Sequence, residues 1–355
     1  MNKKIKLMLL VFLNILVILS LSSCGDLFKD KNKISVTDMV GTEVTVKKNP
    51  SKVACISRTT YDLLVAYGLG DKIDGAYSGT LKNKWLKTVY PNSKKHYVYG
   101  YKNSYELFLN RGVDLVFAPE KHIADELNEH GIPALCVSLY AKPNFSKYVT
   151  FFSKLITQIW DSKEVKTKAN KWESSVNQII TQIKTTLAKN NVARQKIYYI
   201  RGDKPNGVGY TDNKGSFTEY AYSVLGFDFL GSTITTNRPS NEEILKYNPD
   251  VIVAGGIYQT ANLLKLMESP FDSLKAVENR RFYNIPIGVT AFEQLSAMTP
   301  LFFAHQAQVL HPGLFNFDVT KMIKETMAEF FNYQISDKNV LAMLAGTGPD
   351  FAPLV

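Results

Sequence analysis

Two arginines stand where α/β proteins usually contact their ligands. Arg58 directly follows the apolar run VACIS, and Arg201 directly follows the run KIYYI. Short apolar runs rich in β-branched and aromatic residues predict buried strands. A guanidinium group at the end of a strand suits a clamp on carboxylate, catecholate or hydroxamate oxygens. A surface salt bridge explains either arginine equally well.

Tyrosines form the second group of candidate ligand contacts. The run HYVYGY places Tyr97, Tyr99 and Tyr101 on one side of an extended segment, because side chains alternate between the two faces of a strand. Such rings could stack on an aromatic chelate or a macrocycle, and a phenolate could bind Fe(III) directly. An amphipathic edge strand with half-buried rings explains the same pattern.

Other ligand candidates follow predicted strands or lie in loops of the second half of the chain. Ligands of open α/β sheets bind at the carboxyl ends of the strands, so we expect these residues to line one cleft. They are Tyr77, Tyr210, Arg238, Tyr258 and, in the loop 288–293, Phe292.

The sequence has no motif for catalysis. It contains no G-x-S-x-G, H-E-x-x-H, P-loop or C-x-x-C pattern, and its five histidines lack metal-ligand spacing. We therefore predict a binding protein rather than an enzyme, with no catalytic residue, no intrinsic cofactor and no metal site built from protein residues alone. A surface metalloenzyme and an adhesin are the alternatives from other classes.

The longest periodic segment is Asp161 to Lys189. It contains no Gly or Pro, and its apolar residues recur at spacings of three and four, which predicts one helix of roughly 40 Å with a single apolar stripe. Asp161 or Ser162 suits its N-cap. A coiled coil is the alternative, for which one stripe of this length is short.

Two similar segments, which we call the internal echo, lie on either side of this helix in the sequence. The segment ELFLNRGVDLVFA begins at Glu106, and EEILKYNPDVIVA begins at Glu242. Each has a Glu near a helix start, an Asp eight residues later (Asp114 and Asp250) and then a predicted buried strand. Repetition of one unit in both halves indicates two similar α/β halves.

Strands alternate with helices on both sides of the long helix, which indicates mainly parallel sheets. The predicted fold is α/β, with two Rossmann-like lobes joined by one long rigid helix. We expect an N-terminal lobe at 33–145 beginning with a hairpin, a helical linker at 146–190, and a C-terminal lobe at 191–355.

The N-terminus predicts export and lipidation. Residues 1–23 have a lysine-rich start and an apolar run and end in Leu21-Ser22-Ser23, directly before Cys24. This resembles a bacterial lipobox, which predicts a signal peptide at 1–23, lipidation of Cys24 and a tether at 24–32. The protein is then extracytoplasmic and held to the cell membrane by lipid only. A plain signal peptide or a short membrane anchor is the alternative.

The remaining composition is that of a globular protein. The formal charge of +10 favours either anionic ligands or, as we prefer, a solvated lysine-rich surface. Nothing resembles a nucleic-acid-binding module. Cys55 and Cys136 lie in apolar runs and are expected to be buried thiols, although the sequence leaves a disulfide between them open.

The chain resembles the substrate-binding proteins of ABC importers for iron–siderophore complexes, haem and cobalamin. The resemblance covers nearly all of the chain after residue 24. It rests on VTDMVGTEVTVKKNPSKVACIS, the two Glu-x7-Asp units, the long central helix, AVENRRFYNIP and HPGLFNFD, in this order behind a lipobox. Many relatives carry a Trp where this chain has Phe292, which leaves the ligand-facing chemistry open.

The resemblance implies a class III periplasmic-binding-protein fold with ligand between the lobes. It implies a small metal chelate as ligand, most simply a ferric siderophore, with haem, cobalamin or a nickel or cobalt complex as alternatives. It also implies a monomer that delivers this ligand to an ABC permease and its ATPase. In that family a Glu on each lobe meets permease arginines, and Glu106 and Glu242 occupy those positions. Stabilisation of a helix N-terminus explains each Glu as well.

Overall fold

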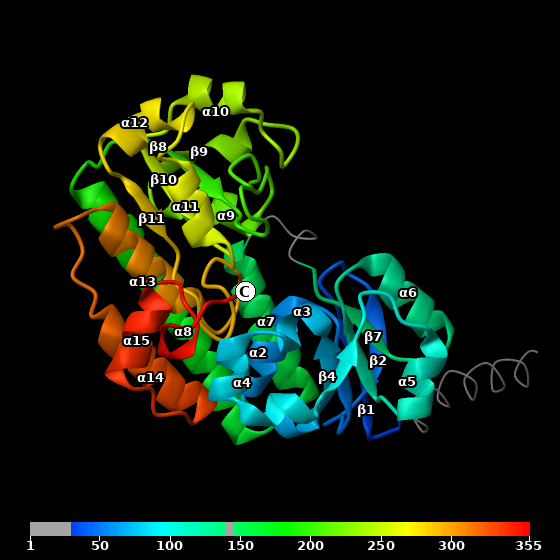
Figure 1. Cartoon of the computed structure of the whole chain (residues 1–355). Helices are drawn as coiled ribbons and strands as arrows, with labels where there is room; N and C mark the ends of the chain where they lie inside the picture. Colours follow the sequence, from blue (N-terminus) through cyan, green and yellow to red (C-terminus); the bar gives the residue numbers. More distant parts are fainter. Residues whose placement is uncertain (1–29, 139–144) are drawn as a thin grey trace, which may run out of the picture.

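The computed structural model describes residues 30–138 and 145–355. The predicted signal peptide, Cys24 and most of the predicted tether lie outside the described residues, within the part drawn in grey in Figure 1. In the described ranges no helix is long and apolar enough to cross a membrane.

The N-terminal lobe is built on a five-stranded parallel sheet in the order β5-β4-β3-β6-β7. Its strands are β3 Val53–Cys55, β4 Ile73–Tyr77, β5 Tyr97–Tyr99, β6 Leu115–Ala118 and β7 Ala134–Cys136. Its helices are α2 Arg58–Ala66, α3 Ser78–Leu81, α4 Lys84–Val89, α5 Tyr105–Arg111 and α6 Lys121–Glu129, with 3₁₀ turns η1 Gly70–Lys72 and η2 Pro91–Lys95. A separate antiparallel hairpin, β1 Lys33–Thr37 and β2 Glu43–Lys47, precedes the sheet, as predicted.

The C-terminal lobe holds a four-stranded parallel sheet in the order β11-β10-β8-β9. Its strands are β8 Gln195–Ile200, β9 Phe227–Phe229, β10 Val251–Ala254 and β11 Phe282–Asn284. Its helices are α9 Phe217–Val224, α10 Asn241–Tyr247, α11 Gln259–Lys265 and α12 Lys275–Glu278, with 3₁₀ turns η3 Leu230–Ser232 and η4 Phe271–Ser273.

Both sheets contain a point at which the strand order reverses direction. In the N-terminal lobe this point lies between β3 and β6, and in the C-terminal lobe it lies between β8 and β10. At such a point the loops after two neighbouring strands turn to opposite faces of the sheet, which leaves a crevice outside the carboxyl ends of the strands. The topology therefore marks one place for a ligand in each lobe.

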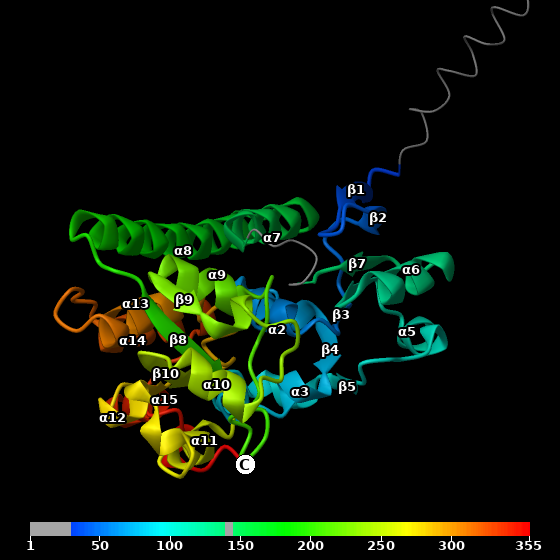
Figure 2. The same cartoon turned by 90° about the horizontal axis from the view of Figure 1, so that it is seen from above.

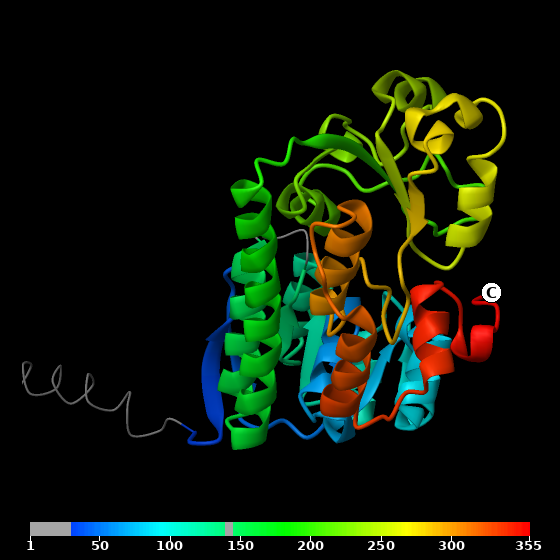
Figure 3. The same cartoon turned by 90° about the vertical axis from the view of Figure 1, so that its left-hand side faces the viewer.

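One helix, α8 Lys163–Lys189, spans the molecule along its back (Figures 2 and 3). It packs against α7, Phe145–Ile159, as well as against α9 and α13, Thr299–Leu310. Ser162 caps it by accepting a hydrogen bond from the N–H of Val165. Its buried residues are the predicted apolar stripe: Val165, Ala169, Trp172, Val176, Ile179, Ile180, Ile183 and Leu187. The predicted fold class, two α/β lobes and one long helix, is confirmed.

The last part of the chain, from α14 onward, returns to the N-terminal lobe. Helix α14, Val319–Phe331, packs on α2, while the 3₁₀ turn η5, Pro349–Phe351, packs on α4 and on α15, Asp337–Leu344. In Figure 3 these orange and red segments lie beside the blue and cyan lobe. The segment predicted as the C-terminal lobe thus includes a helical part that packs against the other lobe.

The internal echo corresponds to the same hydrogen-bond unit in both lobes. The Asp114 carboxylate accepts the N–H of Lys52 at 3.1 Å, and the Asp114 N–H donates to the Lys52 carbonyl at 2.7 Å. Asp250 and Lys196 make the same two bonds, at 2.8 and 2.9 Å. Each unit aligns the start of a central strand, β3 or β8, with the turn before β6 or β10. The two aspartates are therefore structural.

The two cysteines of the described residues are free and buried. Cys55 ends β3 and Cys136 ends β7, and β6 lies between these strands in the sheet. Burial raises the pKa of each thiol to about 12, so both stay protonated at neutral pH. They act as small apolar side chains, and no disulfide joins them.

Trp172 should be the most sensitive single position on α8. Its ring is fully buried, and its Nε1 donates to the Ser296 carbonyl at 3.1 Å. Trp172→Ala removes this contact and opens a cavity, which should lower the free energy of unfolding by roughly 3–5 kcal/mol. Urea unfolding followed by circular dichroism measures it. The exposed Ser174→Ala on the same helix serves as control and should change stability by less than about 0.5 kcal/mol.

Candidate functional site

Four side chains meet at the carboxyl edge of the N-terminal sheet. The Arg58 guanidinium lies over the Tyr77 ring at 4.8 Å, and Nη2 donates to the Tyr77 hydroxyl at 3.4 Å. The Tyr101 ring meets the Tyr77 ring edge-on at 6.2 Å, and its hydroxyl donates to the Glu120 carboxylate. We call Arg58, Tyr77, Tyr101, Glu120 and the neighbouring His122 the N-lobe cluster.

Four members of this cluster lie at or after the ends of four different strands. Arg58 follows β3, Tyr77 ends β4, Tyr101 follows β5 and Glu120 follows β6. Although β5 and β6 are not neighbours, Tyr101 reaches Glu120, so the segment after β5 lies over the edge of the sheet. Arg58 and Glu120 flank the reversal point between β3 and β6, where ligands of such sheets bind.

Tyr97 and Tyr99 do not join the N-lobe cluster. Their rings lie 4.8 Å apart, on one side of the strand as predicted, but Tyr99 is fully buried and its hydroxyl donates to Asp74 at 2.5 Å. Tyr97 lies under the Arg111 guanidinium at 4.0 Å. Since β5 is the outer strand of the sheet, these two rings match the edge-strand alternative.

The C-terminal lobe presents a second group, the C-lobe cluster: Arg201, Asp203, Tyr210, Asp212 and Arg238. Arg201 pairs with Asp203 at 2.9 Å and with Asp212 at 3.3 Å. The Tyr210 ring has two guanidinium neighbours, Arg201 at 5.2 Å and Arg238 at 5.3 Å. The salt-bridge interpretation of Arg201 therefore matches the structure, and its contact with a ligand stays a prediction.

Two glycines bring the loops after β8 and β10 into contact. Gly202 and Gly256 have φ of +52° and +71°, values that favour glycine. A Cβ atom on Gly202 would lie 1.7 Å from the Gly255 carbonyl oxygen. The Tyr258 N–H donates to the Gly202 carbonyl at 3.0 Å, so the half-buried Tyr258 stands beside the Arg201 loop. At the reversal point between β8 and β10, the backbones of the two loops are thus in close contact.

The loop 288–293 contributes a buried carboxyl rather than an aromatic surface. Phe292 is fully buried in the core and offers no surface to a ligand in this structure. Its neighbour Glu293 accepts the Gly256 N–H at 2.8 Å, and the other oxygen of Glu293 has no hydrogen-bond partner within the described residues. Burial raises the pKa of Glu293 to about 7.

Asp62 is a second buried carboxyl near this loop. It lies on α2 and accepts the N–H of Ala297 at 2.8 Å, and in the part of the chain that the structure describes its other oxygen has no hydrogen-bond partner. Burial raises the pKa of Asp62 to about 7. The burial of these two carboxyls is not predictable from the sequence, because each is enclosed by segments more than thirty residues apart in the chain.

The two glutamates of the echo are both exposed, in the first turns of α5 and α10. Backbone N–H groups at the start of α5, and then Ser104, lower the pKa of Glu106. In α10 the capping box uses Glu243, and within the described residues Glu242 has no hydrogen-bond or ion-pair partner. Hydrogen bonds at the helix start therefore account in part for a glutamate at position 106. Glu242 lies in the first turn of α10 but makes no such bond within the described residues.

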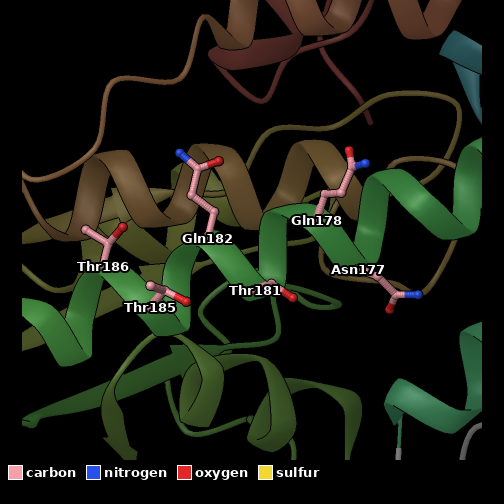
Figure 4. A pocket seen from close by; sticks show the side chains of 6 residues that line it. All are labelled: Asn177, Gln178, Thr181, Gln182, Thr185 and Thr186. Carbon is pink, nitrogen blue, oxygen red and sulfur yellow. The ribbon is translucent and has the colours of Figure 1, made fainter.

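Two hollows in the described part of the chain lie away from the strand ends. One, of about 470 Å³, runs along the outer face of α8 and is lined by side chains of that helix alone (Figure 4). The other, of about 620 Å³, includes His305 and Asp318 near the start of α14. The described residues contain no group of three or more His, Cys, Asp and Glu side chains that could hold a metal ion.

Comparison with known proteins gives the fold a family context. No family model matches the chain. An uncharacterized ABC transporter substrate-binding lipoprotein of Bacillus subtilis, YvrC, is 22% identical over 259 residues, which are 71% of this chain and 78% of the relative.

Solved structures agree over nearly the whole chain. MolA of Haemophilus influenzae, bound to molybdate, superposes with a TM-score of 0.71 at 18% identity, covering 85% of this chain and 99% of MolA. CeuE of Helicobacter pylori with Ni(II) bound gives 0.70 at 18% identity, covering 88% and 99%. The chain has the fold of an ABC-transporter substrate-binding protein. The resemblance predicted from the sequence is confirmed, and these relatives are solute-binding proteins rather than enzymes.

The protonated state of Asp62 can be tested through stability. Because the folded pKa of about 7 lies above the unfolded value, the proton stabilises the fold at low pH, and this contribution is lost as the pH rises through about 7. Asp62→Asn keeps an acceptor for the Ala297 N–H and carries no charge. Relative to wild type, its free energy of unfolding should therefore improve by roughly 1–3 kcal/mol between about pH 5 and pH 8.

Chemical denaturation at the two pH values measures this change. Asp71→Asn, at an exposed carboxyl of the same lobe, is the matched control and should show a nearly constant difference from wild type. A difference between Asp62→Asn and wild type that does not change with pH would contradict the protonated state.

Proposed function

We propose that the protein is the extracytoplasmic receptor of an ABC importer. It would capture a small chelated metal between its lobes and deliver it to a permease driven by an ATPase. The observation that carries this proposal is the placement of the N-lobe and C-lobe clusters at the carboxyl ends of two parallel sheets. The similarity to a substrate-binding lipoprotein supports the same class.

The side chains at the strand ends favour an oxygen-rich organic chelate. Arg58 and Arg238 have aromatic rings as neighbours, and both guanidinium groups are exposed. Guanidinium groups bind carboxylate, catecholate and hydroxamate oxygens, and tyrosine rings cover apolar parts of a ligand. We therefore favour an iron(III) chelate, most simply a ferric siderophore. Haem, cobalamin and nickel or cobalt complexes are the alternatives. MolA is bound to molybdate and CeuE to Ni(II), so proteins of this fold bind different ligands. The fold alone therefore does not select among the alternatives.

Helix α8 limits how the receptor would move. A continuous α-helix bends much less than a pair of extended strands, so ligand capture would need only a small closure of the lobes. A ligand site of nearly fixed width suits a rigid chelate. Helix α8 would also fix the spacing between the two lobes in the receptor that a permease contacts.

Glu106 and Glu242 are the residues that we assign to permease docking. Each is an exposed carboxylate on a different lobe, in the equivalent helix of the repeated unit. Two carboxylates held apart by a rigid body can pair with two separated cations. The proposed lipid on Cys24 would keep the receptor at the membrane surface, where that permease resides.

Ligand class can be decided by fluorescence titration of a form that lacks residues 1–24. Trp85, Trp160 and Trp172 serve as reporters, and the panel holds ferric siderophores, haemin, cobalamin and Ni(II). We expect at least one ferric siderophore to bind with a Kd below about 1 μM, with the iron-free siderophore as control. Equilibrium dialysis gives an independent readout. Absence of binding below the micromolar range for every compound would contradict the receptor function.

Permease docking can be separated from ligand capture by charge reversal. Glu106→Lys combined with Glu242→Lys should abolish uptake of the bound ligand by whole cells, because each lysine repels a permease cation. The ligand Kd of the purified variant should stay within about twofold of wild type. The matched control is Glu126→Lys with Glu278→Lys, which reverses one exposed charge on each lobe and should leave uptake intact. Loss of ligand affinity in the first variant would exclude the docking assignment.

A further inference from the structure

The C-terminal segment 343–353, which we call the strap, is fastened to the N-terminal lobe at the start of α4. Trp85 is fully buried, and its Nε1 donates to the Thr347 carbonyl at 2.8 Å. The Lys84 ammonium donates to the Pro353 carbonyl at 2.5 Å. Because a buried indole N–H that loses its acceptor costs free energy, these contacts resist separation of the strap from the N-terminal lobe.

The first residues of the strap hold the C-terminal lobe instead. The Met343 carbonyl accepts the N–H of Ile287, which follows β11, at 3.1 Å. The Leu344 carbonyl accepts the side-chain amide of Asn284, the last residue of β11, at 2.9 Å. Along the strap, the contacts therefore change from one lobe to the other within a few residues.

Gly346 lies at this crossing, against the first residue of α11. The buried Gln259 donates from Nε2 to the Gly346 carbonyl at 3.4 Å. Gly346 has a φ of +68°, and a Cβ atom on it would lie 2.6 Å from the side-chain amide of Gln259. Only glycine suits both the backbone conformation and the close approach, so this residue lets the strap pass tightly between the lobes.

The strap and α8 lie on opposite sides of the molecule. Figures 2 and 3 show α8 in green on one side and the red C-terminal segment on the other. Beside the strap, Asn83 Nδ2 donates to the carbonyls of Gly288 and Val289 at 3.0 and 3.1 Å, which adds a contact between α4 and the loop after β11. When two bodies are connected on two opposite sides, only rotation about the line that joins the connections remains easy.

We propose that the strap is a second connection between the lobes, which stops them from twisting about α8 and confines their relative motion to one axis. The inference rests on the proposed receptor function for its role, because a ligand held between the lobes needs the N-lobe and C-lobe clusters in one mutual arrangement. The motion itself can be measured without any ligand.

Distances between spin labels test the strap in the ligand-free chain that lacks residues 1–24. The labels are attached at Glu126→Cys on the N-terminal lobe and Glu278→Cys on the C-terminal lobe, both exposed positions. Cys55 and Cys136 are buried and should stay unlabelled. Double electron–electron resonance should give one narrow distance distribution for the chain with an intact strap.

Two variants loosen the strap, and one serves as control. Deletion of residues 346–355 removes most of it, and Gly346→Ala places a methyl group against the Gln259 amide. Gly313→Ala is the matched control, because its φ of +80° gives the same backbone strain and no atom lies within 4 Å of the new Cβ. We expect a broader distribution for the deletion and for Gly346→Ala, and the original distribution for Gly313→Ala. Near-ultraviolet circular dichroism verifies the fold, and Gly346→Ala decides if the deletion variant does not fold.

Ligand affinity is the second readout. If the fraction of molecules in the binding-competent arrangement falls to about a tenth, the Kd for the ligand found by titration should rise about tenfold. Unchanged distance distributions in both strap variants would overturn the inference. Broader distributions with an unchanged Kd would overturn the link to ligand capture. Broader distributions in a chain that binds none of the compounds would support the strap and contradict the receptor function.

Discussion

The structure depends on the burial of a single stripe of α8. The residues of this stripe contact elements of both halves, from α7 on one side to α9 and α13 on the other. Burial of each large apolar side chain of the stripe stabilises the fold by roughly 1.5–3 kcal/mol. Because the stripe lies on one continuous helix, its burial also holds the two lobes together. Because Trp172 also bonds to the Ser296 carbonyl, α8 fixes the segment that holds Phe292 and Glu293 as well.

The repeated Lys–Asp unit places the first strand of each sheet and hence the ligand-facing edge. The backbone N–H of Lys52 and of Lys196 donates to an aspartate carboxylate, and the backbone carbonyl of each lysine accepts the N–H of the same aspartate. The side-chain ammonium of each lysine donates to the carbonyl at the end of a helix, that of Arg111 in α5 or that of Tyr247 in α10. The strand beside this lysine leads to Arg58, three residues after the end of β3, or to Arg201, directly after the end of β8. A purely structural contact at one edge of each sheet thus determines where the arginines stand at the other.

The sequence predicted what local pattern and chain order determine. Periodicity located α8 to within two residues, and the rule that strand ends form the site located Arg58, Tyr77 and Arg201. Packing decided the rest. Tyr99 and Phe292 were ligand candidates like Tyr101, yet both are fully buried because their rings fill the core.

The two clusters are chemically unequal, and this asymmetry has a consequence for recognition. Arg201 is already paired with two carboxylates, so much of its charge is balanced before any ligand arrives. Among the described residues Arg58 has the Tyr77 ring and hydroxyl as partners and no carboxylate, so its charge is less balanced than that of Arg201. The N-lobe cluster also carries the phenol, carboxylate and imidazole donors. Available charge is therefore concentrated on the N-terminal lobe, while the C-lobe cluster presents guanidinium groups already packed around the Tyr210 ring.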